Sequence, residues 1–303
     1  MTSERELVEV DNGVGGVVSA TVNSRADSGG PVIVGIHGSG YTSRYFDLPE
    51  MSLLEDCARE ELLCVALDRP GYGGSDIGPD GFRFASVAGM LDHAVTELWR
   101  RFGAGHTGVV VVAHSVGAAV AVHLAARVSR WPLIGLALSG VGDVSPGQVS
   151  ARWRSLSESV PVDLSGEDRR RLLYGPDWSV RPDVVEQAAC STSSAPTEEL
   201  LEIVDGWFAD LNELAPRVIC PLQYVLAEYD ALRIVSRERL NAFADRFCNS
   251  SYVERFIFRG AGHNIDHHHL GRAFRLQQIA FALRCSETAL CQATSREGAA
   301  TRT

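Results

Sequence analysis

The sequence predicts an α/β domain with a mostly parallel eight-stranded sheet, helices on both faces, and a helical insertion. Short continuous apolar runs alternate with helical patterns, which is typical of parallel strands that are covered on both sides. This alternation stops after residue 141 and resumes near residue 218. A chain of 303 residues is long enough for one large domain that carries an insertion.

The first predicted element is an opening hairpin. Two strand-like runs, at about 6–10 and 17–22, flank the glycine-rich turn DNGVGG. The later strands are continuous apolar runs at 32–36, 62–67, 108–113, 133–138, 222–226 and 252–258. Helices are predicted at roughly 48–60, 87–102 and 116–128.

The insertion is predicted to be helical because it contains no strand-like run of comparable strength. Its clearest feature is one helix, in which apolar residues recur at i, i+3, i+4, i+7, i+8 and i+11 from Leu200 to Leu211. We therefore expect a core of residues 1–141 and 218–285, with a helical cap at 142–217. Residues 286–303 are polar and unpatterned, and we expect them to form a disordered tail.

Composition excludes several classes of function. All 28 basic residues are arginine, so Schiff-base lysine chemistry, a pyridoxal-phosphate anchor and a Walker A lysine are excluded. A net charge of -10 argues against nucleic acid as a partner. Mean hydropathy near zero argues against a membrane protein, and the most apolar stretch, 108–128, is interrupted by His114, Ser115 and His123.

The cysteines indicate a reducing compartment. There are seven, they are scattered, and none forms a C-x-x-C pair. The first residues lack a basic region followed by an apolar one, so no signal peptide is expected. We expect a cytoplasmic protein whose partner is a small-molecule substrate; the oligomeric state stays open.

The segment 109–119, VVVVAHSVGAA, carries the strongest chemical signal. A β-branched run ends in small-x-Ser-x-Gly and continues directly into an alanine-rich helix, as a nucleophile elbow requires. The tight turn needs small flanking residues, which are Ala113 and Gly117 here, although alanine stands where glycine is usual. Ser115 is therefore the candidate nucleophile, and the alternative is a helix N-cap.

Four further segments are VGIHGSG at 34–40, ALDRPGYGGS at 66–75, PLQYVLAEYD at 221–230 and FRGAGHN at 258–264. With these, the sequence resembles the α/β-hydrolase family, specifically its serine-nucleophile, capped small-molecule hydrolases, across nearly the whole chain. The resemblance implies a His-Gly oxyanion loop, an acid that follows a strand, and a catalytic histidine near the end of the core, in the order Ser, Asp, His.

The expected catalytic chemistry needs three side chains. Ser115 requires a base, His263, and Asp230 would hold the imidazole in one tautomer. Backbone N–H groups of Val116 and Ser39 would stabilise the oxyanion, and neither a metal nor an organic cofactor is required. Two other carboxylates compete for the role of the acid, namely Glu228, two residues before Asp230, and Asp143, which follows the preceding strand.

Residues of the substrate pocket are predicted less directly. His114 lies beside the nucleophile and His37 lies in the oxyanion loop; each could pack or shape the pocket. Within the cap, Trp178 and Trp207 are among the aromatic residues that could line an apolar pocket. The run DHHH at 266–269 suggests metal ligands, but three consecutive histidines cannot face one point, so we expect an exposed helix start and no metal.

The resemblance implies a hydrolase that cleaves an ester, thioester or lactone of a small or medium-sized apolar molecule through an acyl-enzyme. Serine at the elbow argues against dehalogenase and epoxide hydrolase chemistry, which would use aspartate. The same triad also serves acyl transfer, carbon–carbon bond hydrolysis and cofactor-free lyase chemistry. A non-catalytic ligand-binding protein of the same fold is the alternative from a different class.

Overall fold

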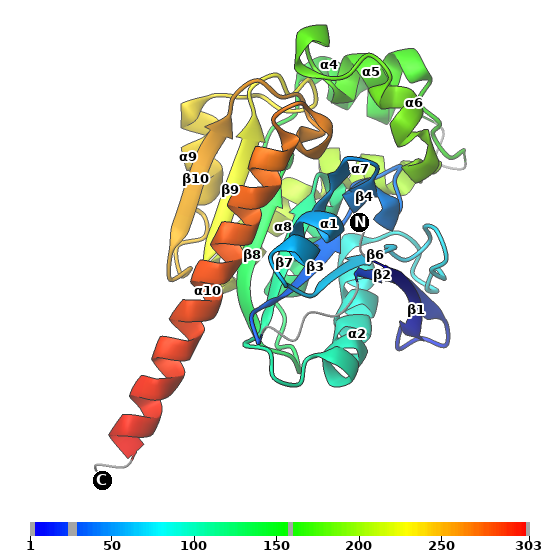
Figure 1. The fold of residues 1–303 in the computed structure, drawn as a ribbon. Helices are drawn as coiled ribbons and strands as arrows, with labels where there is room; N and C mark the ends of the chain where they lie inside the picture. Colours follow the sequence, from blue (N-terminus) through cyan, green and yellow to red (C-terminus); the bar gives the residue numbers. More distant parts are fainter. Residues whose placement is uncertain (1–3, 24–28, 157–159, 301–303) are drawn as a thin grey trace.

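A computed structural model describes residues 4–23, 29–156 and 160–300. One eight-stranded sheet has the order β1-β2-β6-β3-β7-β8-β9-β10, from right to left in Figure 1. β1 and β2 form the predicted hairpin, β2 is also antiparallel to β6, and the other neighbours are parallel, which confirms the predicted sheet. The strands are Arg5–Asp11, Val17–Asn23, Val32–Ile36, Cys64–Leu67, Val109–His114, Leu133–Ser139, Leu222–Ala227 and Val253–Phe258.

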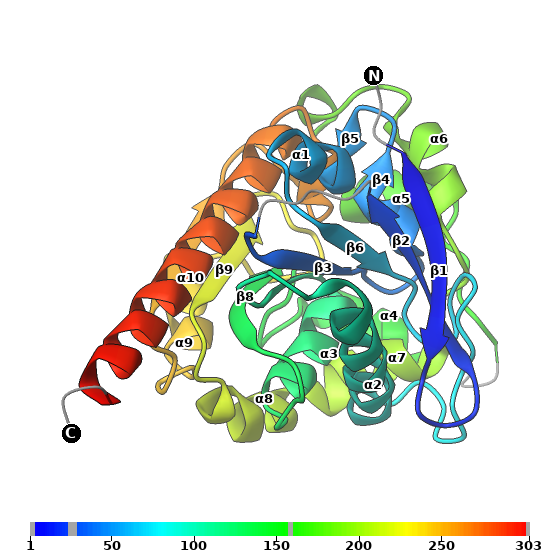
Figure 2. The same cartoon turned by 60° about the horizontal axis from the view of Figure 1, so that its bottom comes forward.

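Helices cover both faces of this sheet. Alternate residues of β7 point to opposite sides, because Val109 and Val111 belong to one apolar core and Val110 and Val112 to the other. The first core contains side chains of α2 (Phe84–Phe102), α3 (Val116–Ala125), α8 (Trp207–Leu214) and α9 (Arg237–Ala244). The second contains those of α1 (Leu53–Arg59) and α10 (Gly271–Ala300), which lie in Figure 2 on the opposite side of the sheet from α2 and α3.

The insertion between β8 and β9 is helical, as predicted. Figure 1 shows α4, α5 and α6 above the sheet, beyond one end of its strands. The single helix expected around Leu200 to Leu211 is wrong, because it is divided at Gly206 into α7 and α8. Glycine is a weak helix former, and the division lets α8 pack in the core beside α3. The helices are α4 Gly147–Arg154, α5 Gly166–Leu173, α6 Val184–Ala188 and α7 Thr197–Asp205.

Two other expectations need correction. The helix expected at 48–60 begins only at Leu53, because a short hairpin of β4 (Asp47–Leu48) and β5 (Met51–Ser52) precedes it. The disordered tail expected at 286–303 is wrong up to Ala300, where α10 ends, and residues 301–303 lie outside the described residues. The last turns of α10 lack an apolar stripe but contain strong helix formers such as alanine, glutamate and glutamine. Within the described residues, no helix is both long enough and apolar enough to cross a bilayer.

Candidate active site

Ser115 lies in a sharp turn between β7 and α3. Its backbone has φ of 55° and ψ of -124°, a left-handed conformation that is rare for a residue with a side chain. A Cβ on Gly117 would come within 2.3 Å of the His37 carbonyl oxygen, so this position admits only glycine. The crowding explains the small residue required two positions after the serine, and the turn leaves Ser115 lining the pocket.

Three side chains that follow different strands meet at this turn. His263 Nε2 lies 2.9 Å from Ser115 Oγ, and His263 Nδ1 lies 2.8 Å from Asp230 Oδ2. The other oxygen of Asp230 accepts from the Leu232 N–H at 2.8 Å. A carboxylate that accepts from Nδ1–H leaves the lone pair of Nε2 free to take the serine proton.

The two competing carboxylates lie elsewhere. Glu228 accepts from the Gly260 N–H at 2.9 Å and is exposed. Asp143 faces two arginines, with Oδ2 at 3.3 Å from Arg246 Nη2 and 3.8 Å from Arg239 Nη1. Of the three candidate acids, only Asp230 reaches His263.

The amides expected to form an oxyanion hole border the same cavity. Val116 is the first residue of α3, so its N–H has no partner within the helix, and the positive end of the helix dipole lies there. Ser39 lies in the loop after β3, and both residues line the pocket beside Ser115. Tyr72 fixes this loop, since its hydroxyl oxygen accepts from the Gly40 N–H at 3.3 Å and lies 3.2 Å from Ser39 Oγ.

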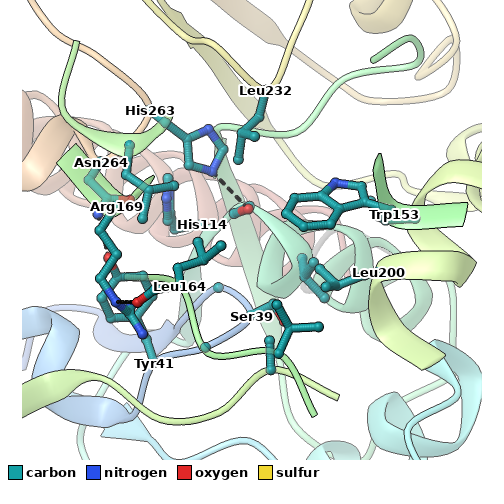
Figure 3. Close-up of a pocket in the computed structure, with 18 of the residues that line it drawn as sticks. Ser39, Tyr41, His114, Trp153, Leu164, Arg169, Leu200, Leu232, His263 and Asn264 are labelled. Atoms are coloured by element: carbon teal, nitrogen blue, oxygen red, sulfur yellow. Dashed lines mark hydrogen bonds between the residues drawn. The ribbon is translucent and has the colours of Figure 1, made fainter. Parts of the chain in front are cut away.

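The pocket is mostly apolar and contains about 680 Å³ of empty space, including the part that opens to solvent. Its apolar lining comes largely from the insertion, whose side chains face Ser115 and His263. Figure 3 shows Trp153 and Leu200 on one side of the His263 ring and Tyr41, Arg169 and Asn264 on the other. The apolar lining residues are Val116, Trp153, Val162, Leu164, Leu173, Ala195, Leu200, Ile203 and Leu232.

Three of the four predicted pocket residues do not line the cavity. Trp178 is 65% exposed and packs edge-on against Tyr229. Trp207 is buried in the core under the sheet, where its Nε1 donates to the Gly142 carbonyl at 2.9 Å. His37 holds the oxyanion loop: Nδ1 donates to the Gly38 carbonyl at 2.8 Å, and Nε2 accepts from the Arg69 N–H at 3.0 Å.

His114 is the predicted residue that does line the pocket. Its ring stacks on Tyr45 with centroids 5.0 Å apart, and Nδ1 lies 3.0 Å from Ser139 Oγ. Burial lowers the pKa of His114 well below the ordinary value, and the nearby His263 adds to this effect. A neutral imidazole therefore supports the site without adding a charge next to His263.

The DHHH run is not an exposed helix start, because Asp266, His267 and His268 are all buried. His267 Nε2 donates to the Tyr45 carbonyl at 3.0 Å, and burial lowers the pKa of His267 to about 3. His268 Nδ1 donates to the Asn264 carbonyl at 2.8 Å. These bonds fix the loop that carries His263, a role that the repeated histidines do not suggest in sequence.

Sequence patterns missed Trp153, Arg169 and Glu199. The first two line the pocket, and the third is a buried carboxylate on α7 that holds Arg69. Trp153 lies on α4, where Gln148, Arg152 and other polar residues hide any apolar stripe. No local signal marks Glu199, because it follows an equally acidic Glu198 in the first turn of its helix.

The chain matches the sequence model of one protein family and resembles several solved structures in fold. A model of the alpha/beta hydrolase family matches residues 33–275, and no curated protein matches the chain. A thermophilic esterase from Thermogutta terrifontis is 20% identical with a TM-score of 0.65, over 93% of this chain and 99% of that one. An esterase from Exiguobacterium antarcticum is 14% identical with a TM-score of 0.67, over 93% and 99%. A 2-hydroxy-6-oxo-6-phenylhexa-2,4-dienoate hydrolase from Rhodococcus sp. strain RHA1 is 17% identical with a TM-score of 0.65, over 92% and 99%.

Proposed function

Because the chain belongs to the alpha/beta hydrolase family, we propose that it is a serine hydrolase that cleaves an ester, thioester or lactone through an acyl-enzyme. The observation that carries this proposal is the hydrogen-bonded series from Ser115 through His263 to Asp230 at the floor of an apolar pocket. A serine that only capped a helix would need neither the strained backbone nor a buried imidazole on its hydroxyl.

In the acylation step, Ser115 Oγ attacks the substrate carbonyl carbon while His263 Nε2 takes the hydroxyl proton. The carbonyl oxygen gains the negative charge, and the N–H groups of Ser39 and Val116, two residues that line the pocket, donate to it. Collapse of this intermediate breaks the bond to the leaving group, which receives the proton from His263. Asp230 stays ionised and stabilises the imidazolium.

In the deacylation step, water replaces the leaving group. His263 takes a proton from the water, whose oxygen attacks the acyl carbon, and the proton returns to Ser115 Oγ as the acid departs. The cap side chains determine which acyl groups fit, since the insertion supplies most of the apolar lining. The cap is thus proposed to set substrate choice.

A fluorophosphonate probe followed by whole-protein mass spectrometry tests this function. Wild-type protein should gain the mass of one probe molecule. Its turnover of a panel of p-nitrophenyl esters should be lost in parallel with this labelling. Ser115→Ala should not be labelled, and its kcat should fall by roughly 10⁴ or more. Ser86→Ala, which removes a hydroxyl from the exposed start of α2, is the matched control and should behave as the wild type.

Two results would contradict the proposal. One is equal labelling of Ser115→Ala, which would move the nucleophile elsewhere. The other is a wild-type protein that is neither labelled nor active on any ester, as expected of a non-catalytic binding protein with this fold.

A further inference from the structure

The pocket lining has two positive charges and no negative one. Arg169 and Arg233 line it, and no aspartate or glutamate belongs to its described lining. Arg233 has an evident structural use, because its guanidinium donates to the Gly140 carbonyl at 3.0 Å and to Ser145 Oγ at 2.8 Å. Arg169 needs a separate explanation.

Arg169 differs from its neighbours in how its charge is compensated. Arg170 and Arg171, on the same helix α5, pair with Asp177 at 2.9 Å and Asp168 at 2.8 Å. Asp168 also holds Arg152 at 2.9 Å. Among the residues that the structure describes, none places a carboxylate within ion-pair distance of Arg169.

Contacts with Leu164 and Tyr41 orient the guanidinium of Arg169. Nε donates to the Leu164 carbonyl at 3.1 Å, and the guanidinium carbon lies 5.9 Å from the centre of the Tyr41 ring. Tyr41 is fixed in turn by Asn264, whose Nδ2 donates to its hydroxyl at 2.7 Å. These three residues form a polar corner of the pocket, opposite Trp153 and Leu200 in Figure 3.

We propose that this polar corner binds a carboxylate group of the substrate. The preferred substrates are then esters or thioesters that carry a free, ionised carboxyl group in addition to the bond that is cleaved. The inference rests on the proposed hydrolase function and narrows its substrate class. The two terminal nitrogens of a guanidinium match the two oxygens of a carboxylate. Arg169 is half-buried in a mostly apolar pocket, where such a contact is stronger than in water. The apolar side opposite takes the remainder of the molecule.

Two matched substrates test the inference. One is the mono-p-nitrophenyl ester of hexanedioic acid, which keeps a free carboxylate, and the other is its methyl p-nitrophenyl diester, in which that charge is masked. At fixed ionic strength, the wild type should prefer the charged ester by about 10-fold or more in kcat/KM. Arg169→Gln should lower this ratio by about 10-fold, and Arg169→Lys, which keeps the charge but not the fork, should lower it less.

Arg171→Gln is the matched control, because it removes the same charge from the same helix at an exposed ion pair. It should keep the wild-type ratio. The proposal is overturned if the wild type turns over the diester as fast as the charged ester. It is equally overturned if Arg171→Gln loses as much preference as Arg169→Gln, since the effect would then be long-range.

Calorimetric titration with hexanedioate separates this proposal from the proposed function. If neither ester is turned over, hydrolase activity fails, but hexanedioate binding that is lost in Arg169→Gln and retained in Arg171→Gln still supports the polar corner. Absence of binding to the wild type overturns the corner even if neutral esters are hydrolysed.

Discussion

Glu199 and Arg69 form an ion pair in which both side chains are completely buried. Arg69 Nη1 lies 2.5 Å from Glu199 Oε1, and Nη2 lies 3.1 Å from Oε2. The same guanidinium donates to the His37 carbonyl at 2.9 Å and the Gly38 carbonyl at 3.3 Å, and the Tyr72 hydroxyl donates to Glu199 at 2.7 Å. The insertion is thereby bonded to the loop that carries the expected oxyanion amide.

Glu199 is therefore predicted to act as a positioning residue for that loop. Glu199→Gln should lower kcat by about 10-fold with little change in KM, because the transition state depends on the loop more than substrate binding does. It should also destabilise the protein by about 3–5 kcal/mol, since it leaves a buried guanidinium unpaired. Glu198→Gln, one residue earlier and exposed, should change neither quantity.

A double variant separates positioning from stability. Arg69→Met with Glu199→Leu replaces the buried pair by apolar side chains, which often restores stability. The free energy of unfolding, measured with urea, should then recover. The kcat should stay low, because the hydrogen bonds from Arg69 to His37 and Gly38 are absent. A kcat that recovers together with stability would leave Glu199 with a purely structural role.

Asp230→Asn is expected to lower kcat by roughly 10⁴ while the fold is retained. The amide would bond to His263 in the wrong tautomer, as in the serine protease triad, whose magnitude we carry over. Asp143→Asn and Glu228→Gln are matched controls. Each should lower kcat by less than about 10-fold, since neither carboxylate reaches the imidazole. A large loss confined to Asp143→Asn would reassign the acid.

Alanine substitution of three tryptophans in the insertion should distinguish effects on substrate selectivity from effects on stability. Trp153→Ala enlarges the pocket, so the kcat/KM ratio of p-nitrophenyl octanoate to butyrate should rise by roughly 10-fold. Trp207→Ala should instead cost about 3–5 kcal/mol of stability through a core cavity, with an unchanged ratio. Trp178→Ala, at an exposed position, should affect neither. A changed ratio in Trp207→Ala with unchanged stability would contradict these placements.

The sheet and the meeting of Ser115, Asp230 and His263 were predictable because each has a local signature. Ser115 follows a β-branched run in a turn that needs small residues two positions away on either side, and Asp230 and His263 follow two later strands. Since the carboxyl ends of parallel strands share one edge of a sheet, correct strands already place these side chains near each other.

The pocket was not predictable from local patterns, because it depends on how the insertion packs. Trp153, Trp178 and Trp207 all lie in helical or loop sequence, yet Trp153 lines the pocket, Trp178 is exposed and Trp207 is buried in the core. The partner of Glu199 is separated from it by 130 positions and lies in a loop of the core. No periodicity within either segment indicates such a contact.

Four buried histidines give the protein a predictable pH dependence of stability. Desolvation lowers the pKa of His37 and His114 well below the ordinary value, that of His267 to about 3, and that of His268 as well. In the unfolded chain each imidazole titrates near pH 6.5. Below about pH 6.5 the unfolded chain therefore binds more protons than the folded one. The free energy of unfolding consequently decreases as the pH is lowered. Above that pH these groups add no pH dependence.

His267→Gln should make stability less sensitive to acid. A fully buried neutral imidazole contributes at most about 1.4 kcal/mol per pH unit between its two pKa values, so the variant should lose about that much slope between pH 5.5 and 4.5. Glutamine keeps a donor that can bond to the Tyr45 carbonyl, which preserves the loop. His269→Gln, two residues along and exposed, should keep the wild-type slope. Urea unfolding at each pH measures it, and equal slopes for His267→Gln and the wild type would mean that His267 is protonated in the folded protein.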